Sequence, residues 1–263
     1  MSAHDPGLAG HNLPTDLNPN PALSQVAYDP SAGPPDSAAE AEAHGLSLVA
    51  HQFDDLAQQH EASTLGMWVF LATEILFFGG VLMAYWIYRT IYPEAWALAG
   101  EQQNTLAGGI NTLVLITSSL TMALAVRTAQ LGSRRRATLV LLFATMLFGA
   151  TFLGIKAYEY NAHWHEGLFP GSHFTWHENP ELAPKVQLFM VFYWGMTGLH
   201  ALHMVIGVGL LVWIISRAWR SHFGPEYYSP VEVMGLYWHF VDIVWIFLFP
   251  FLYLIPHFGV QHG

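Results

Sequence analysis

Five ionisable side chains lie inside long apolar stretches of this sequence, where their chemistry is most unusual. Glu74 lies in the first stretch, His200 and His203 in the fourth, and His239 and Asp242 in the fifth. Each later pair is separated by three positions, which places its members on one face of a helix. Ionisable groups at membrane depth are candidates for function because hydrocarbon disfavours charge.

The three histidines have two interpretations. Haem or copper ligation in a helical bundle needs imidazoles that converge from facing helices, yet the first three apolar stretches contain no histidine. The alternative is that the histidines form hydrogen bonds between packed helices, and His239 and Asp242 can also contact each other along one face without any ligand. We favour the hydrogen-bonding interpretation and predict no metal on this chain.

Glu74 also has two possible roles, which the sequence supports equally. A buried carboxylate can relay protons or sense a neighbouring site. It can also be a neutral acid that ties the first helix to another helix.

Two further groups of polar residues lie outside the apolar stretches. Arg217 and Arg220 follow the fourth stretch, close to Trp213, where guanidinium groups meet lipid phosphates or simply anchor the helix. Histidines are also frequent in the expected loop at 156–185. Those loop histidines could bind a surface metal, but we expect them to be solvated: His163, His165, His173 and His177.

The composition predicts the elements that hold these residues. Hydrophobic residues make up 53% of the 263 residues and charged residues only 11%, against about 25% in soluble domains. Five stretches of about 18 residues or more can each cross a hydrocarbon core of roughly 30 Å as a helix. We therefore predict an all-α, polytopic membrane protein, a bundle of five transmembrane helices at about 66–88, 109–126, 137–155, 186–216 and 233–255.

The chain divides into unlike parts. Residues 1–64 are acidic and rich in proline without Lys or Arg, which predicts a disordered N-terminal tail and no cleaved signal peptide. Residues 65–256 form the membrane domain, and 257–263 form a short C-terminal tail. The net charge of −10 disfavours nucleic acid as a partner, and the absence of cysteine excludes disulfides and thiolate-bound metals.

Basic residues near the helix ends predict the orientation, because they are enriched on the cytoplasmic side. Six flank the ends on the side of the N-terminal tail, and three flank the opposite ends. We therefore expect a cytoplasmic N-terminus and an outside C-terminus. The two groups are Arg127, Arg134, Arg135, Arg136, Arg217 and Arg220 against Arg89, Lys156 and Lys185.

Four sequence stretches carry a family resemblance. GLYWHFVDIVWIFLF at 235–249, TGLHALHMVIG at 197–207, WVFLATEILFFGG at 68–80 and KAYEYNAH at 156–163 follow the family order across about 64–256. Together they resemble subunit III of the haem–copper terminal oxidases, in its five-helix bacterial form. Other members often have seven helices, so an extra helix-bearing subunit could complete the bundle here.

The resemblance implies an accessory chain rather than a catalytic one. Haem and copper would lie in partner subunits I and II. This chain would pack on subunit I, hold structural phospholipid, and sustain proton uptake and the lifetime of subunit I. Glu74 matches the family's buried carboxylate, and Arg217 matches a basic residue near lipid head groups. The remaining matches are the polar signature positions Glu159, His200, His203, His239 and Asp242.

We therefore expect a multi-pass subunit of a bacterial inner-membrane oxidase that reduces oxygen to water, pumps protons and takes electrons from cytochrome c. Membership of a respiratory supercomplex is compatible with this role. Alternatives are the matching subunit of a quinol oxidase or of a nitric oxide reductase, which the partner's haem and copper content would distinguish. An alternative of another class is an independent transporter or a haem-bearing cytochrome, for which a purified chain would show a Soret band.

Overall fold

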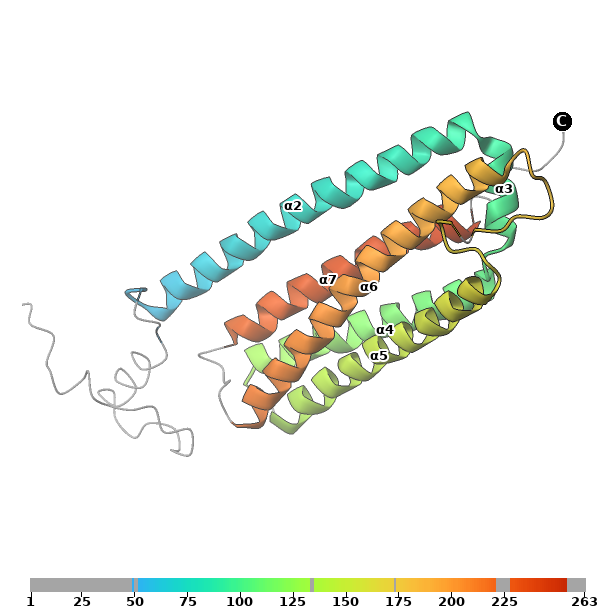
Figure 1. Ribbon diagram of the computed structural model, residues 1–263. Coiled ribbons are helices and arrows are strands. Elements are labelled where there is room, and N and C mark those ends of the chain that lie inside the picture. The colour runs from blue at the N-terminus through green and yellow to red at the C-terminus, as the bar shows by residue number, and fades with distance from the viewer. Residues whose placement is uncertain (1–48, 50–51, 133–134, 173, 221–227, 255–263) are drawn as a thin grey trace, which may run out of the picture.

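A computed structural model of the chain describes residues 49, 52–132, 135–172, 174–220 and 228–254. Its regular elements, within those residues, are helices (Figure 1). In chain order they are α2 (Leu56–Ile91), α3 (Pro93–Glu101), α4 (Thr105–Gln130), α5 (Arg135–His165), α6 (Ala183–Trp219), α7 (Ser229–Phe249) and a π-helical turn, η2 (Pro250–Leu254).

Five of the segments are long and apolar enough to cross a membrane, namely α2, α4, α5, α6 and α7 continued by η2. The two shortest contain 26 residues, which at 1.5 Å per residue extend about 39 Å and exceed the roughly 30 Å hydrocarbon core. The predicted all-α bundle of five spanning helices is thus confirmed. The short helix α3 was not predicted, and its buried Trp96 packs beside α6.

All five spanning helices begin before their predicted starts, and the first four also continue past their predicted ends. The predicted start at residue 66 differs from the structure, because the Asp55 side chain caps α2 by accepting a hydrogen bond of 2.7 Å from the Gln58 backbone. The helix therefore begins at Leu56, within the segment predicted to be tail. Residues 1–48 of that tail and residues 257–263 lie outside the described residues.

The helix α7 lies at the centre of the bundle, in contact with α2, α4 and α6, and α4 and α5 form an adjacent pair (Figure 1). Trp238 of α7 is fully buried between α5 and α6. A Cβ added at Gly149 would lie 2.7 Å from its ring, and one at Gly207 would lie 3.0 Å away. Glycine at these two positions therefore lets α5 and α6 approach the indole.

The helix α2 runs along one side of the bundle and contacts α7 and α6 (Figure 1). Its buried residues include Leu71, Phe78 and Tyr85, seven positions apart, so a narrow seam faces the other helices. The Tyr85 hydroxyl donates a 2.6 Å hydrogen bond to the Phe251 carbonyl of η2. Much of the outer surface of α2, such as Leu76, is exposed and apolar, as a surface in lipid requires.

Candidate functional site

Glu74 and His203 form the first polar contact between spanning helices. The Glu74 Oε2 atom of α2 lies 3.3 Å from the Nε2 atom of His203 on α6. Glu74 occupies the seam of α2, between Leu71 and Phe78, so the face that packs on the bundle also directs this carboxylate inward. The Glu74 side chain is 20% exposed and the His203 side chain 15%, so the contact is only partly accessible from outside.

The hydrogen bonds of His203 fix where its protons can be. Its Nδ1 atom lies 2.8 Å from the Leu199 carbonyl oxygen, which can only accept, so Nδ1 carries a hydrogen. A favourable contact between Nε2 and the carboxylate then requires one more proton, on either Glu74 or the imidazole. The pair can therefore hold one exchangeable proton inside the membrane domain.

Lys156 and Glu159 form a second, fully enclosed site. The Nζ and Oε2 atoms are 3.2 Å apart, and the side chains are 2% and 5% exposed. Lys156 also donates to the hydroxyls of Tyr193 and Tyr253, at 3.1 and 2.8 Å. Both tyrosines in turn donate to Glu159 Oε1. This network satisfies both charges and joins α5, α6 and η2.

The placement of Lys156 corrects two predictions, the end of the third spanning helix at residue 155 and the position of Lys156 at the membrane surface. The helix α5 continues to His165, and Lys156 is buried within it. The i,i+3 spacing of Lys156 and Glu159 was the signal that a helical ion pair could form. Of the basic residues counted on that side of the bundle, Arg89 and Lys185 remain.

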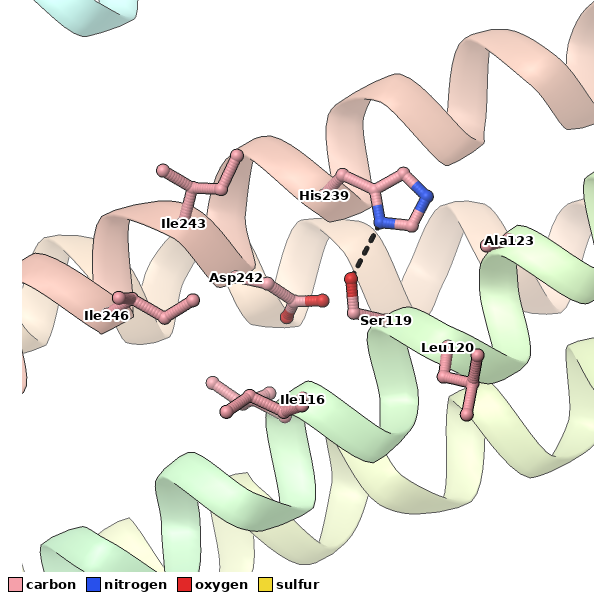
Figure 2. Close-up of a pocket in the computed structure, with 9 residues that line it drawn as sticks. Ile116, Ser119, Leu120, Ala123, His239, Asp242, Ile243 and Ile246 are labelled. Atoms are coloured by element: carbon pink, nitrogen blue, oxygen red, sulfur yellow. Dashed lines mark hydrogen bonds between the residues drawn. The ribbon is translucent and has the colours of Figure 1, made fainter.

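Ser119, His239 and Asp242 form a third polar group, between α4 and α7 (Figure 2). The Ser119 hydroxyl lies 2.7 Å from His239 Nδ1. The Asp242 side chain points toward the same hydroxyl and into a cavity of about 400 Å³ (Figure 2). Asp242 is 3% exposed, and neither carboxylate oxygen has a hydrogen-bond partner among the described residues. His239 therefore bonds to Ser119 of another helix, instead of forming the expected contact with Asp242.

His200 differs from His203 and His239. It is 1% exposed, and neither ring nitrogen has a hydrogen-bond partner in the described part of the chain. Its ring lies 5.3 Å from that of Phe152 and 5.1 Å from that of Trp245. His239 thus hydrogen-bonds to another helix, and His203 contacts the Glu74 carboxylate of another helix, whereas His200 is enclosed by aromatic rings.

The candidate lipid-binding residues lie on the outside of the bundle, at the end of α6. Trp213, Arg217 and Arg220 are all exposed. The Arg217 guanidinium lies 5.2 Å from the centre of the Trp213 ring, within the range of a cation–π contact.

A mostly apolar cavity of about 390 Å³ lies between α2 and α7, beside the contact of these two helices. Trp68, Ile75 and Leu82 line it from α2, and Leu236 and Phe247 line it from α7. We call this the α2/α7 cavity. Sequence reasoning did not find it, because it depends on how far apart the two helices pack.

The histidines expected in a loop are separated by the structure. His163 and His165 belong to α5, and His163 is buried. His165 and His177 line one surface hollow of about 560 Å³, and His173 lies outside the described residues. Within the described ranges, no group of three His, Asp or Glu side chains is arranged to hold a metal ion.

Comparison with known proteins gives a consistent match. The family model for cytochrome c oxidase subunit III matches residues 52–257. The chain is 32% identical to cytochrome c oxidase subunit 3 of Thermostichus vulcanus, over 78% of this chain and 93% of that protein. It is 27% identical to quinol oxidase subunit 3 of Bacillus spizizenii, over 81% of this chain and 95% of that protein. It is also 31% identical to haem-copper oxidase subunit I+III of Aeropyrum pernix, over 72% of this chain and 22% of that longer protein.

Proposed function

This chain belongs to the cytochrome c oxidase subunit III family, and from that premise we propose that it is the third subunit of an aerobic respiratory oxidase. The complex would reduce oxygen to water and pump protons. The family match across residues 52–257 carries this proposal, since it covers all the spanning helices.

Catalytic subunit I is the proposed principal partner, with subunit II completing the core of the enzyme. The similarity to a single polypeptide named subunit I+III supports this partner. Fusion of two subunits into one chain keeps them adjacent, so a subunit III-like segment has a natural position beside subunit I.

His200, His203 and His239 do not fit a haem or copper site on this chain. His203 contacts the Glu74 carboxylate of α2, and His239 hydrogen-bonds to Ser119 of α4. His200 is enclosed by Phe152 and Trp245. We therefore place the redox centres in the partner subunits and assign no electron-transfer step to this chain.

Cytochrome c is the proposed electron donor of the complex. The support is the identity of 32% to a cytochrome c oxidase subunit, compared with 27% to a quinol oxidase subunit. The quinol oxidase relative makes quinol the second candidate donor. A dinuclear copper domain in subunit II of the purified complex would favour cytochrome c, and its absence would favour quinol.

Glu74 is proposed to support proton uptake by the complex. The support is its contact with His203, which can hold an exchangeable proton and is partly open to the exterior of the bundle. The Lys156–Glu159 network has a different role in this proposal. It is closed by two tyrosines and holds three elements together.

Phospholipid is proposed to bind at two places. The α2/α7 cavity is apolar, as an acyl chain requires. Arg217 and Arg220 are exposed at the end of α6, where guanidinium groups would pair with phosphates.

The chain is proposed to lie in a bacterial inner membrane with its N-terminus in the cytoplasm. Burial of Lys156 removes one basic residue from the proposed outer side, so the basic residues near helix ends favour this orientation more strongly.

An affinity tag on this chain tests the proposal in native membranes. Gentle detergent extraction should recover a complex that contains subunits I and II, absorbs as haem and consumes oxygen. Recovery of the intact chain without any oxidase subunit would overturn the proposal.

A further inference from the structure

Asp242 is a buried acid whose neighbouring hydroxyl, that of Ser119, is already bonded to His239 (Figure 2). Its side chain is 3% exposed, both carboxylate oxygens lack a hydrogen-bond partner among the described residues, and the group points into the cavity between α4 and α7 (Figure 2). The carboxylates of Glu74 and Glu159, by contrast, are engaged within this chain. Beyond the Ser119 hydroxyl, which His239 already engages, the cavity leaves Asp242 open to a partner from outside the described residues.

The depth of Asp242 limits what that partner can be. The last spanning segment runs from Ser229 to Leu254, and Asp242 lies near its middle, about 20 Å from either end. A hydrocarbon core is roughly 30 Å thick, so phospholipid head groups cannot reach this level. Acyl chains reach it but offer no hydrogen bond, so a side chain from another protein segment is the remaining source.

The surroundings of Asp242 resemble a contact surface for a helix. Ile116 and Leu120 of α4 and Ile243 and Ile246 of α7 are exposed and line the cavity around the acid. Exposed apolar residues around a few polar groups favour helix packing in membranes, where interhelical hydrogen bonds add to close contact. We call this surface the α4/α7 groove.

The α2/α7 cavity gives a useful contrast. It is lined almost entirely by apolar side chains, and its one ionisable lining residue, His239, bonds to Ser119. An acyl chain can fill that cavity at no polar cost. The α4/α7 groove has a polar requirement that lipid cannot meet.

We propose that the α4/α7 groove docks a transmembrane helix of the catalytic subunit, which places a hydrogen-bond-donating side chain against Asp242. A hydroxyl, indole, amide or basic group would serve as the donor. This inference rests on the proposed function and adds to it the surface that faces the catalytic subunit. The similarity to a subunit I+III polypeptide supports that choice of occupant.

Site-specific photocrosslinking in the intact complex tests the occupant. Benzoylphenylalanine would replace Leu120 or Ile246 in the groove, and the matched control would replace Val205, which is exposed on α6. After illumination, mass spectrometry would identify the crosslinked product. We expect adducts with the catalytic subunit from both groove positions, at about tenfold or greater yield over the control.

Each other outcome has a definite meaning. Adducts only with lipid or with a second copy of this chain, in a complex that still contains the catalytic subunit, would overturn the docking surface and leave the proposed function standing. Equal adducts with the catalytic subunit from Val205 would also overturn it. A preparation with no catalytic subunit would overturn the proposed function itself.

Substitution of Asp242 gives a second, independent readout. Asp242→Leu should weaken retention of this subunit in the detergent-extracted complex by about tenfold. The same change should leave thermal unfolding of the separated full chain unchanged or raise its midpoint, because it removes an unpaired buried acid. Asp242→Asn, which can still hydrogen-bond, should restore retention.

Glu232→Gln is the matched control, since Glu232 is an acid in the first turn of the same helix. It should retain the subunit normally. Unchanged retention in Asp242→Leu would overturn the proposal. So would a lower unfolding midpoint of the separated chain together with equal loss of retention in Asp242→Asn, since the acid would then serve only the fold of this chain.

Discussion

Glu74 and His203 face each other across the boundary between α2 and α6, with 3.3 Å between Oε2 and Nε2. Because the other ring nitrogen donates to the Leu199 carbonyl, this contact needs a proton of its own. The helix that carries Glu74 is attached to the bundle through a narrow seam. This pair therefore lies where α2 meets the rest of the membrane domain.

Glu74→Gln should leave the complex assembled while changing its turnover or its rate of inactivation. Glutamine can still hydrogen-bond to His203, but it cannot exchange a proton. Oxygen consumption followed over many turnovers, together with the subunit content, would measure the effect. Glu101→Gln, at the exposed end of α3, is the control. Loss of assembly in Glu74→Gln would instead show a purely structural role.

Lys156→Met should destabilise the chain by about 3–5 kcal/mol, because it leaves Glu159 charged and buried without its cation. The double substitution Lys156→Met with Glu159→Gln should recover much of the loss. Thermal unfolding in detergent would measure Lys156→Met, Glu159→Gln and the double variant. If the losses of stability of the two single variants simply added in the double variant, the buried pair would not be coupled.

Gly149→Ala should cost about 1–3 kcal/mol, since the new Cβ would lie 2.7 Å from the Trp238 ring. Gly154→Ala on the same helix is the matched control. Nothing lies within 4 Å of a Cβ at that position, so alanine there should stabilise the helix slightly. Thermal unfolding of the two variants should therefore shift in opposite directions, and equal shifts would contradict the close packing of Trp238.

The joint substitution of Arg217 and Arg220 by Gln should reduce the phospholipid that copurifies with the complex, because two exposed guanidinium groups are lost. Native mass spectrometry would count the bound lipids. Arg127→Gln, at the end of α4, removes an exposed basic residue that has no assigned lipid role. An identical lipid content in the double variant and this control would contradict the assignment.

Much of the fold could be predicted because it depends on local composition. Apolar length alone indicates which segments span the membrane. The true helix ends could not be found this way, since Asp55 extends α2 through a polar turn and the buried Lys156 lies beyond the apolar part of α5. Hydropathy treats both as loop residues.

The candidate site was predicted as a set of residues but not as a set of contacts. Spacing correctly put His239 and Asp242 on one helix face, which Figure 2 shows. It could not indicate that Ser119 of α4 would lie against His239, because the register between two helices depends on packing along their whole length. The same reason applies to Glu74 and His203, which are far apart in the sequence.

The most direct test of the central claim is the absorption spectrum of this chain before and after its removal from the purified complex. The account predicts a haem Soret band and oxygen consumption in the complex that copurifies with a tagged chain. It predicts no Soret band and no bound copper in the chain once detergent has separated it. Haem or copper retained by the separated chain would contradict the account.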